Sequence, residues 1–463
     1  MEAPLPFELL SYILLLLYKD PSIPRAEDDF ENTHKLQPAM MVCKRWKHVV
    51  ERSPVLWTDM WLGHSPRRLG TTVYHEWLES VEVQINRSGK LPLNLNIMVE
   101  CVMLDGVLRV LKPHLSRCRW LGLRGSSDEA AAQDKCSKLC VDTTPSVIHR
   151  LLSSPFPALN FLSIDDFIPY RIVETDDGDT DRFVFIDAPN LISITSRCPH
   201  LKAMVKSLDP SAFTHPSLQD LSLCGSWSDN PFVIPTDIFN LPNLKNLRLE
   251  NTDYLWQLLS ALSTPYLENL VVACGLAYWP PASELPFNAS TMMHLRRLEW
   301  HTSSNAECEA PSLRCLLRHS PSLISFAYIC DTDYEDPRAW ARNRSGPEEI
   351  DEVLNILFEK EVEESKLCPN LRSLSFVFMS LDNVVGLIEL WPALERISIQ
   401  ARETKDVVIT GSREEWRIKV DQMKWIRSRV EFVFPTLELP TSLLQEENIA
   451  WDPDGTTDGM EGV

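Results

Sequence analysis

A short phrase recurs along most of the chain: proline, any residue, leucine, two further residues, then two apolar residues separated by one position. It begins at Pro157, Pro216, Pro242, Pro265, Pro321, Pro369 and Pro392. The alternating apolar residues at its end predict a short strand with one buried face. One such unit is too small to bury that face alone, so copies of it have to stack on one another.

The spacing of the phrase sets the size of each unit. Its leucines at 218, 244, 267, 295 and 323 lie 26, 23, 28 and 28 residues apart, and the copy at Leu295 lacks the proline. This period resembles that of leucine-rich repeats, which recur about every 20–29 residues. The resemblance implies an α/β fold, an irregular solenoid with parallel strands inside and helices outside. The helices are expected at residues 255–262, 313–319, 347–360 and 381–389.

The chain is expected to have four parts. They are a helical unit at 1–62, linker helices (71–83 and 102–112) with the first irregular repeats at 63–156, the repeat array with its end cap at 157–435, and an acidic disordered tail at 436–463. The cap is a helix opened by a capping box at Ser412–Glu415, followed by a strand at 430–434.

Three polar insertions interrupt the repeats, at residues 125–145, 169–187 and 331–347. The second contains Glu174 to Asp181, in which carboxylates alternate as they do in part of a calcium loop. The distal Glu of an EF-hand is missing, so no metal site is expected there.

The charge of the chain and the length of its apolar runs argue against nucleic acid and membranes as partners. The chain carries 65 Asp and Glu residues against 45 Lys and Arg, a net charge of −20. Nucleic acid is therefore not an expected partner, because phosphate binding needs a basic surface. An acidic surface is ordinary for a solvated protein, and a basic substrate is the sharper alternative. The apolar run Leu9–Tyr18 is too short to span a bilayer, so no membrane association is expected.

The cysteines and the missing motifs argue against catalysis. The 12 cysteines include no C-x-x-C pair and are expected to be reduced core thiols of a cytoplasmic or nuclear protein. No nucleotide-binding, zinc-protease or hydrolase motif occurs. Cys315 and His319 have helical spacing, but a core thiol beside a surface imidazole is the expected interpretation. The chain is therefore expected to be no enzyme and to need no cofactor, with an unrecognised hydrolase as an open alternative.

The N-terminal segment carries three ordered motifs. They read Leu5-Pro6-x-Glu8-Leu9-Leu10-x-x-Ile13-Leu14, then Val42-Cys43-Lys44-Arg45-Trp46, then Leu56-Trp57. Together they resemble the F-box, a three-helix domain. The segment between the first two motifs is longer than is usual in that family, and Pro38 is expected to shorten the second helix.

The resemblance implies a docking role. In the family this unit packs on a Skp-type adaptor, which connects it to a cullin and a RING subunit. The residues expected in or beside that interface are Leu5, Pro6, Leu9, Leu10, Ile13, Leu14, Val42, Trp46, Leu56 and Trp57. The surplus of leucine at 14–17 also suggests that a partner covers some face, because so small a domain has a thin core. The alternative is that these leucines pack against residues 73–112.

Residues between the buried leucines of each strand are expected on the concave side of the solenoid, where a target protein would bind. They are Asp220, Ser222, Asn246, Arg248, Glu250, Asn269, Arg297, Glu299, His301, Ser373, Ser375, Arg396, Ser398 and Gln400. The hypothesis is a non-catalytic substrate receptor of an SCF-type ubiquitin ligase. The alternative is a leucine-rich-repeat scaffold that joins no ligase.

Overall fold

The computed structural model describes a subset of the chain in detail. The described residues are 5–19, 32–62, 71–98, 104–124, 151, 154–164, 188–196, 216–224, 239–250, 259, 262–274, 292–302, 313–330, 368–376, 381–399 and 424–433. The chain forms two compact units, Met1–Thr264 and Pro265–Val463, and each is considered by itself.

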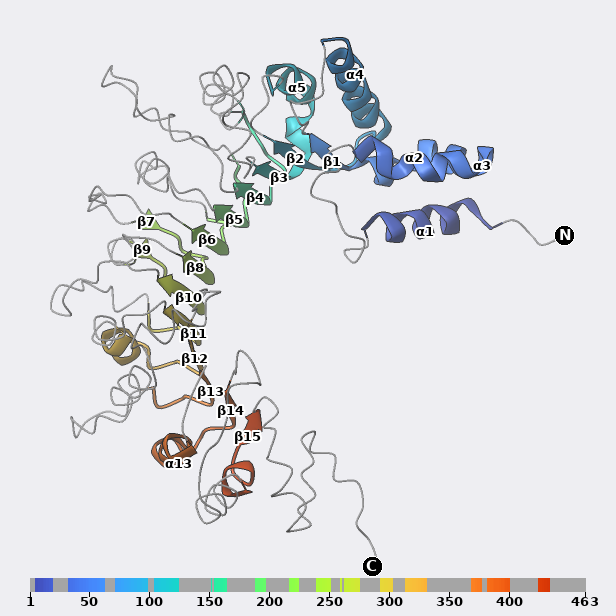
Figure 1. The fold of residues 1–463 in the computed structure, drawn as a ribbon. Helices are drawn as coiled ribbons and strands as arrows, with labels where there is room; N and C mark the ends of the chain where they lie inside the picture. The colour runs from blue at the N-terminus through green and yellow to red at the C-terminus, as the bar shows by residue number, and fades with distance from the viewer. Residues whose placement is uncertain are drawn as a thin grey trace, which may run out of the picture. The chain divides into compact units, whose positions relative to one another are not determined.

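The first unit opens with a helical cluster (Figure 1). Its elements are α1 (Phe7–Lys19), α2 (Asn32–Val42), α3 (Lys44–Arg52) and the short 3-10 helix η1 (Pro54–Trp57). Leucine at every third or fourth position gives α1 a face that packs on α3 and η1. The core of the cluster consists of Leu10, Leu14, Leu36, Val49, Val50, Leu56 and Trp57.

The second helix departs from expectation. It begins at Asn32 and continues through Pro38 to Val42, so Pro38 lies inside the helix and does not cut it short. A proline in this position costs one main-chain hydrogen bond. Packing offsets that loss, because Leu36 is only 4% exposed and Ala39 and Met40 also pack on the core.

The helices expected at 71–83 and 102–112 are confirmed as α4 (Thr71–Arg87) and α5 (Leu104–Leu111), followed by η3 (Lys112–Arg117). After α4 the chain turns at Gly89, whose φ of 61° favours glycine. The guanidinium of Arg117 donates hydrogen bonds to the carbonyls of Leu91 (2.7 Å) and Ile85 (3.2 Å). The bond to Ile85 satisfies a carbonyl group that the end of α4 leaves without a helical partner. The bond to Leu91 holds the segment that follows the turn.

The rest of the first unit is a parallel sheet. Its neighbouring strands, in order, are β1 (Asp59–Leu62), β2 (Leu93–Met98), β3 (Cys118–Arg124), β4 (Phe161–Ile164), β5 (Ser193–Ser196), β6 (Asp220–Cys224) and β8 (Asn246–Glu250). A separate parallel pair joins β7 (Phe239–Asn240) to β9 (Leu262–Ser263). Strand β9 contains Leu262, which had been expected to end a helix. The sheet begins at Asp59, inside the segment expected to be helical, so cluster and sheet are continuous in sequence.

The second unit continues the same construction. Its strands pair in parallel and in chain order: β10 (Asn269–Cys274), β11 (Arg297–Thr302), β12 (Ser325–Cys330), β13 (Ser373–Phe376), β14 (Arg396–Ile399) and β15 (Glu431–Val433). Residues 313–318 are helical, and α13 (Leu381–Leu390) confirms the helix expected at 381–389. Strand β15 confirms the strand expected at 430–434.

The repeat arrangement expected from the phrase is confirmed in both units. The phrase leucines 218, 244, 267, 295, 323, 371 and 394 are all buried, none more than 4% exposed. Each is followed by a strand whose apolar positions face inward, as Leu247 and Leu249 do in β8. In the second unit larger side chains fill this layer, and the rings of Phe326 and Phe376 meet edge to face at 6.1 Å.

Several expectations fall outside the described residues. They are the three polar insertions, the helix at 347–360, most of the helices at 255–262 and 413–426, and the tail at 436–463. Within the described ranges, no helix combines the length and apolar character that crossing a membrane requires. In the same ranges, no group of three or more His, Cys, Asp or Glu side chains is arranged to hold a metal ion.

Candidate protein-interaction surfaces

Helix α1 is apolar on a buried face and on an exposed one. Its inner face places Leu10 and Leu14 in the core of the cluster, at 2% and 4% exposure. Its outer face carries the exposed side chains of Leu9, Tyr12, Ile13, Leu16 and Leu17. At 100° per residue, Leu9, Tyr12 and Leu16 project roughly 100° or more around the helix from Leu10 and Leu14, and Ile13 and Leu17 lie between the two sets. A surface helix of a globular protein normally carries polar residues on the face that points away from the core.

Other contacts fix how α1 is held. The guanidinium of Arg45 on α3 donates a hydrogen bond to the carbonyl of Leu5. The hydroxyl of Ser11 donates to that of Ser53, just beyond α3, at 2.9 Å. More apolar side chains are exposed on the same cluster, namely Leu5 (51%), Met41 (78%) and Val42 (61%). We call Leu5, Leu9, Tyr12, Ile13, Leu16, Leu17, Met41 and Val42 the helical docking face.

The structure divides the residues expected to contact an adaptor. Leu5, Pro6, Leu9, Ile13 and Val42 are exposed, and Trp46 is half-buried against the core. Leu10, Leu14, Leu56 and Trp57, in contrast, lie inside the cluster, which leaves them no surface for a partner.

Trp57 shows why the buried group belongs to the core. Its indole N–H donates to the carbonyl of Val50 at 2.8 Å, and the guanidinium of Arg87 from α4 covers its ring at 4.6 Å. A linker helix thus covers Trp57. The alternative that the leucines at 14–17 pack against residues 73–112 does not hold for Leu16 and Leu17, which stay exposed.

Sequence reasoning missed four members of the helical docking face: Tyr12, Leu16, Leu17 and Met41. The signal for Tyr12 and Leu16 was available, since they stand three and seven positions after Leu9 on the same side of a helix. The motif resemblance did not include them, so they were passed over.

The residues predicted on the open face of the strands are partly or fully exposed where the structure describes them, but this face also carries Val271, Ala273, Ala327 and Ile329 in β10 and β12. In every repeat the residues between the buried ones are partly or fully exposed, as Ser222 and Arg248 are in the first unit and Glu299 and Ser375 in the second. Parallel pairing aligns them in rows, such as Arg297, Ser325, Ser373 and Arg396. Of the residues expected there, only Gln400 lies outside the described chain.

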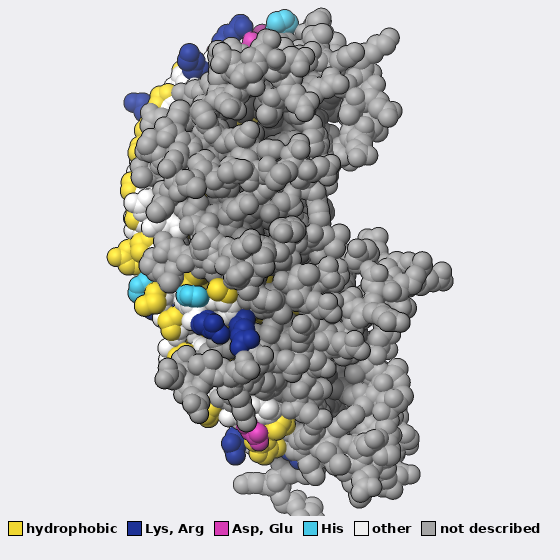
Figure 2. All heavy atoms as spheres, turned by 90° about the vertical axis from the view of Figure 1, so that its left-hand side faces the viewer, with side chains coloured by type: hydrophobic (Ala, Val, Ile, Leu, Met, Phe, Trp, Pro, Cys, Tyr) yellow, Lys and Arg dark blue, Asp and Glu magenta, His cyan; other side chains and the backbone are white. Residues whose placement is uncertain are grey.

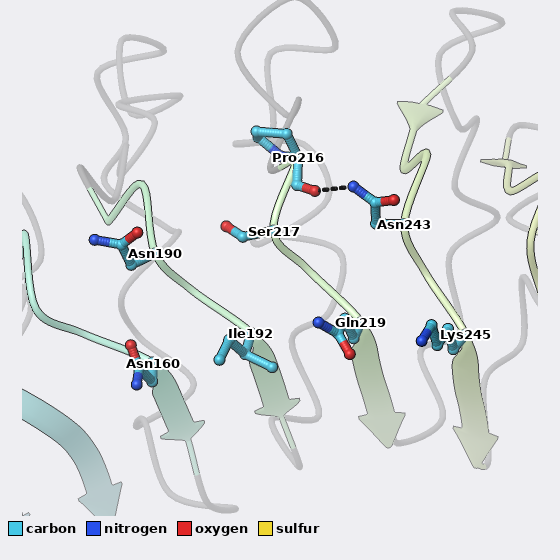
Figure 3. Close-up of a pocket in the computed structure, with 8 residues that line it drawn as sticks. All are labelled: Asn160, Asn190, Ile192, Pro216, Ser217, Gln219, Asn243 and Lys245. Carbon is cyan, nitrogen blue, oxygen red and sulfur yellow. Dashed lines mark hydrogen bonds between the residues drawn. The ribbon is translucent and has the colours of Figure 1, made fainter.

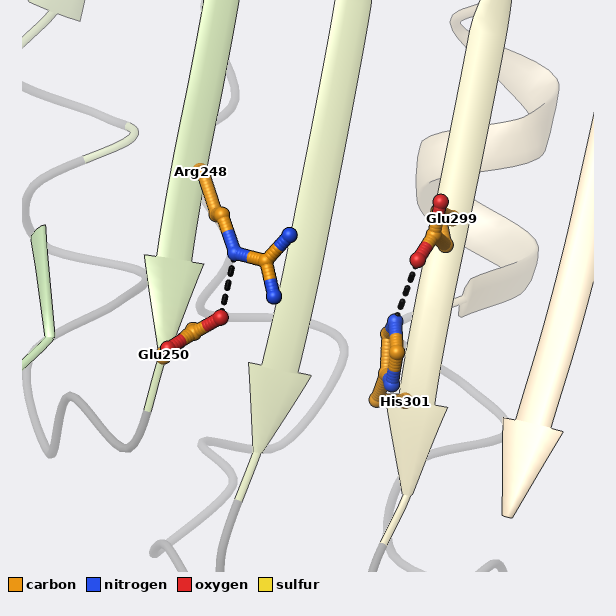
Figure 4. A network of polar contacts seen from close by, with 4 residues as sticks. All are labelled: Arg248, Glu250, Glu299 and His301. Carbon is orange, nitrogen blue, oxygen red and sulfur yellow. Dashed lines mark hydrogen bonds and ion pairs between the residues drawn. The ribbon is translucent and has the colours of Figure 1, made fainter. Parts of the chain in front are cut away.

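Polar contacts order this face within each unit (Figure 4). In the first unit Arg248 pairs with Glu250 along β8, and the amide of Asn246 donates to Asp220 on the adjacent strand. In the second unit, the imidazole Nε2 of His301 lies 2.6 Å from the carboxylate of Glu299 on β11. These pairs hold the side chains in defined directions, which lowers the entropy that a binding partner would have to remove.

An aromatic group at the start of the sheet was not expected. The ring of Trp120 lies over Gly122, where an added Cβ would stand 2.4 Å from the ring and 2.7 Å from the amide oxygen of Asn96. Nearby on the same face, the guanidinium of Arg124 covers the ring of Trp61 at 4.8 Å. No phrase precedes β1 or β2. Before β3, however, the residues from Pro113 through Leu115 and Cys118 to Trp120 do fit the phrase, and sequence reasoning missed this copy.

A shallow hollow of about 500 Å³ lies at the edge of the first unit where strands β4 to β8 begin (Figure 3). Its upper rim is a ladder in which the Asn or Ser after a proline bonds back to the proline carbonyl of the preceding repeat. Asn190, which follows Pro189, donates to the carbonyl of Pro157 (2.7 Å), Ser217 to that of Pro189 (2.6 Å) and Asn243 to that of Pro216. The ladder gives a structural role to the residue that follows the proline, and it recurs in the second unit as Asn370 to Pro321 at 3.1 Å.

The thiol–imidazole pair singled out in the sequence has no catalytic geometry. The sulfur of Cys315 lies 3.8 Å from Nδ1 of His319, but that nitrogen donates to the carbonyl of Cys315 at 2.7 Å. A nitrogen that carries a proton in that bond has no lone pair for the thiol. Burial also raises the pKa of the Cys315 thiol, partly offset by Arg318, and therefore disfavours the thiolate.

Comparison with known proteins adds little beyond the fold. No protein-family model matches the sequence, and no curated protein matches it. Among solved structures the chain is similar to the leucine-rich repeat-containing protein LegL7 from Legionella pneumophila, at 14% identity and a TM-score of 0.31, over 73% of this chain and 86% of that one. It is also similar to a protein from Bacteroides fragilis, at 13% identity and a TM-score of 0.32, over 77% and 78% of the two chains. The repeat architecture described above therefore rests on the strand register of this chain.

Proposed function

We propose that this protein is a non-catalytic substrate receptor of an SCF-type ubiquitin ligase. In this proposal the helical docking face binds a Skp-type adaptor, which links the chain to a cullin and a RING subunit, in the cytoplasm or nucleus. The open strand face holds a protein target. The observation that carries the proposal is the outer face of α1, apolar and exposed on a helix whose other side is already packed.

The physical argument starts from the energy of that face. Burying one leucine or isoleucine side chain is worth about 1.5–3 kcal/mol. Leu9, Ile13 and Leu16 forgo this gain in the free chain, since each keeps 38–53% of its surface in water. Exposed apolar groups of this kind mark surfaces that meet another protein.

The motif resemblance indicates which protein. Of the residues that it places at an adaptor interface, Leu5, Pro6, Leu9, Ile13 and Val42 are the exposed ones. They come from the first two of its three motifs, in and just before α1 and at the end of α2. The buried members Leu10, Leu14, Leu56 and Trp57 act indirectly, because they hold these helices together.

The strand face supports the receptor half of the proposal. Most of its side chains are polar, of mixed charge and partly fixed by neighbours, which suits recognition of a protein surface. Catalysis in such a ligase comes from proximity: the target's lysines are brought near a charged conjugating enzyme. In this proposal no residue of the chain does chemistry and no cofactor is needed.

Co-expression with a Skp-type adaptor tests the proposal. The full chain should co-purify with the adaptor, and Leu9→Ser with Ile13→Ser should abolish this. The matched control is Val83→Ser with Leu91→Ser, which changes two apolar side chains that are 46% and 39% exposed on and after α4. The proposal fails if the α1 variant retains the adaptor, or if the control loses it equally.

The second candidate is a repeat scaffold that joins no ligase. One observation favours it: η1 runs directly into β1, and Asn94 on β2 bonds the carbonyl of Thr58 at 2.9 Å, so the cluster is positioned to cap the sheet. A wild-type chain that ignores the adaptor but still binds a protein through its strands would establish the scaffold instead.

A further inference from the structure

Two adjacent arginines, Arg296 and Arg297, are exposed at the start of β11. Among the described residues, no carboxylate lies within ion-pair distance of Arg296 or Arg297. Glu268 neighbours Arg296 through the main chain, at 2.8 Å from amide to carbonyl, but the two side chains form no ion pair. The two exposed guanidinium groups make this part of the described surface positive, in a chain whose net charge is −20.

Other arginines on the same edge of the second unit provide the contrast. Arg372 forms an ion pair with Glu395 at 2.8 Å, and Arg396 approaches Glu431 at 3.9 Å. All four arginines stand at or just before the first residue of a strand, at β11, β13 and β14 of the second unit. Among the described residues, this position forms an ion pair at β13 and β14 and forms none at β11.

Large apolar side chains surround the unpaired arginines. Tyr266 is 57% exposed, Met293 51% and Ile324 37%. The ring of Tyr266 lies 6.2 Å from that of His294, and the amide of Ile324 bonds the carbonyl of Arg296 at 2.9 Å. A space-filling view shows hydrophobic, histidine and Lys or Arg side chains side by side on a strip of the described surface (Figure 2). Arg, Tyr and Met are the residue types enriched in protein interfaces.

We propose that Tyr266, Met293, His294, Arg296, Arg297 and Ile324 form an arginine patch that binds an acidic segment of a protein target with an apolar side chain beside its carboxylates. This deepens the proposed function, on which it rests, by assigning the chemical class of the target. The guanidinium groups provide planar, paired donors that match carboxylates. The tyrosine, methionine and isoleucine provide the contact for the apolar side chain, which excludes water from the charged pairs.

Selection from a random peptide library displayed on phage tests the patch on the purified full chain. The wild type should enrich peptides in which Asp or Glu flanks an aromatic or aliphatic residue. Arg296→Gln with Arg297→Gln should lose that enrichment and weaken a selected peptide about tenfold or more. The matched control, Arg372→Gln, removes an arginine that is already paired with Glu395 and should leave both unchanged.

Three results would overturn the inference. In the first, the wild type enriches no acidic peptides. In the second, the Arg296/Arg297 variant selects the same acidic peptides as the wild type. Alternatively, acidic peptides would appear only after deletion of residues 436–463, in which case the chain's own acidic end is the occupant. Circular dichroism of each variant shows whether the fold is kept.

The outcome is separable from that of the proposed function. Adaptor binding is measured through α1, and the arginine variants should keep it. If the adaptor fails to bind while acidic peptides are still selected, the ligase proposal falls and the patch stands. If the adaptor binds and no acidic peptide is selected, only the inference about the target falls.

Discussion

Leu9 and Leu10 are neighbours in α1 and lie in opposite environments, Leu9 50% exposed and Leu10 2% exposed in the core of the helical cluster. One helix thus performs two tasks with the same kind of side chain. The inner leucines hold the cluster together, and the outer ones remain available. Substitutions at the two positions should therefore separate stability from binding.

Leu10→Ala should lower the free energy of unfolding of the helical cluster by about 2–4 kcal/mol, because it removes a buried side chain and leaves a cavity. Leu9→Ala should change it by about 0.5 kcal/mol or less, as exposed positions usually do. Urea titration followed by far-UV circular dichroism measures both. Equal losses at the two positions would show that the outer face of α1 is packed as well.

Gly122→Ala should disturb the sheet at β3, because the new Cβ has no room between the Trp120 ring and the amide oxygen of Asn96. We expect a loss of about 1–3 kcal/mol and a change in tryptophan fluorescence, since overpacking forces neighbours off their preferred positions. Gly89→Ala is the comparison. It meets no atom within 4 Å but places alanine at a φ of 61°, so it should destabilise by about 1 kcal/mol without the fluorescence change.

The ladder of the phrase can be cut one step at a time. Asn243→Ala removes the hydrogen bond to Pro216, and Asn190→Ala removes the one to Pro157. Each should cost about 0.5–1.5 kcal/mol, the usual net value of one hydrogen bond. The double variant should lose the sum, because the two bonds share no partner. Thermal melts of the three variants provide the check, and a neutral Asn243→Ala would show that the ladder contributes nothing.

Thiol chemistry should follow burial. The Cys118 and Cys368 thiols are buried, and desolvation raises the pKa of each to about 12, whereas Cys43, between α2 and α3, is exposed. Iodoacetamide followed by mass spectrometry should label Cys43 in the native protein and the other two only after unfolding. Native labelling of Cys118 at a rate close to that of Cys43 would contradict the packing of β3.

The same shift has a consequence for stability. In the unfolded chain the Cys118 thiol has the ordinary pKa of 9.0. In the folded chain its pKa is about 12. The contribution of the protonated thiol to stability is therefore fully present below the pKa of the unfolded state. It is lost as the pH rises from that pKa to the pKa of the folded state. Compared with the wild type, Cys118→Ala should lose less stability over that range in alkaline urea titrations.

Much of the fold could be predicted because the phrase repeats. Leu218, Leu244 and Leu267 mark buried positions whose spacing alone defines a stacked strand unit, and the register confirms it. The first three strands could not be predicted in the same way. Leu95 and Leu121 are as buried as the later leucines, but the spacing of the phrase does not mark them. Leu121 lies six residues after Leu115, whereas its partner Leu162 lies three residues after Leu159.

The candidate site was predictable in part. The alternation of β8 and β11 identifies the open face correctly, since period two is fixed by strand geometry. The motif resemblance did not separate exposed from buried residues in the helical cluster. Leu9 and Leu10 have identical side chains in one motif, and only the packing of α1 on α3 and η1 distinguishes them. The ion pairs that set Arg297 apart from Arg396 also depend on neighbours distant in sequence.

The central claim, that the outer face of α1 is open in the free chain and covered by an adaptor, is tested most directly by carbene footprinting with mass spectrometry. The account predicts labelling of Leu9, Tyr12, Ile13 and Leu16 in the free protein and their protection at saturating Skp-type adaptor, with Leu10 and Leu14 unlabelled in both states. Labels that persist on the outer face with the adaptor present, or an outer face already protected without it, would contradict the account.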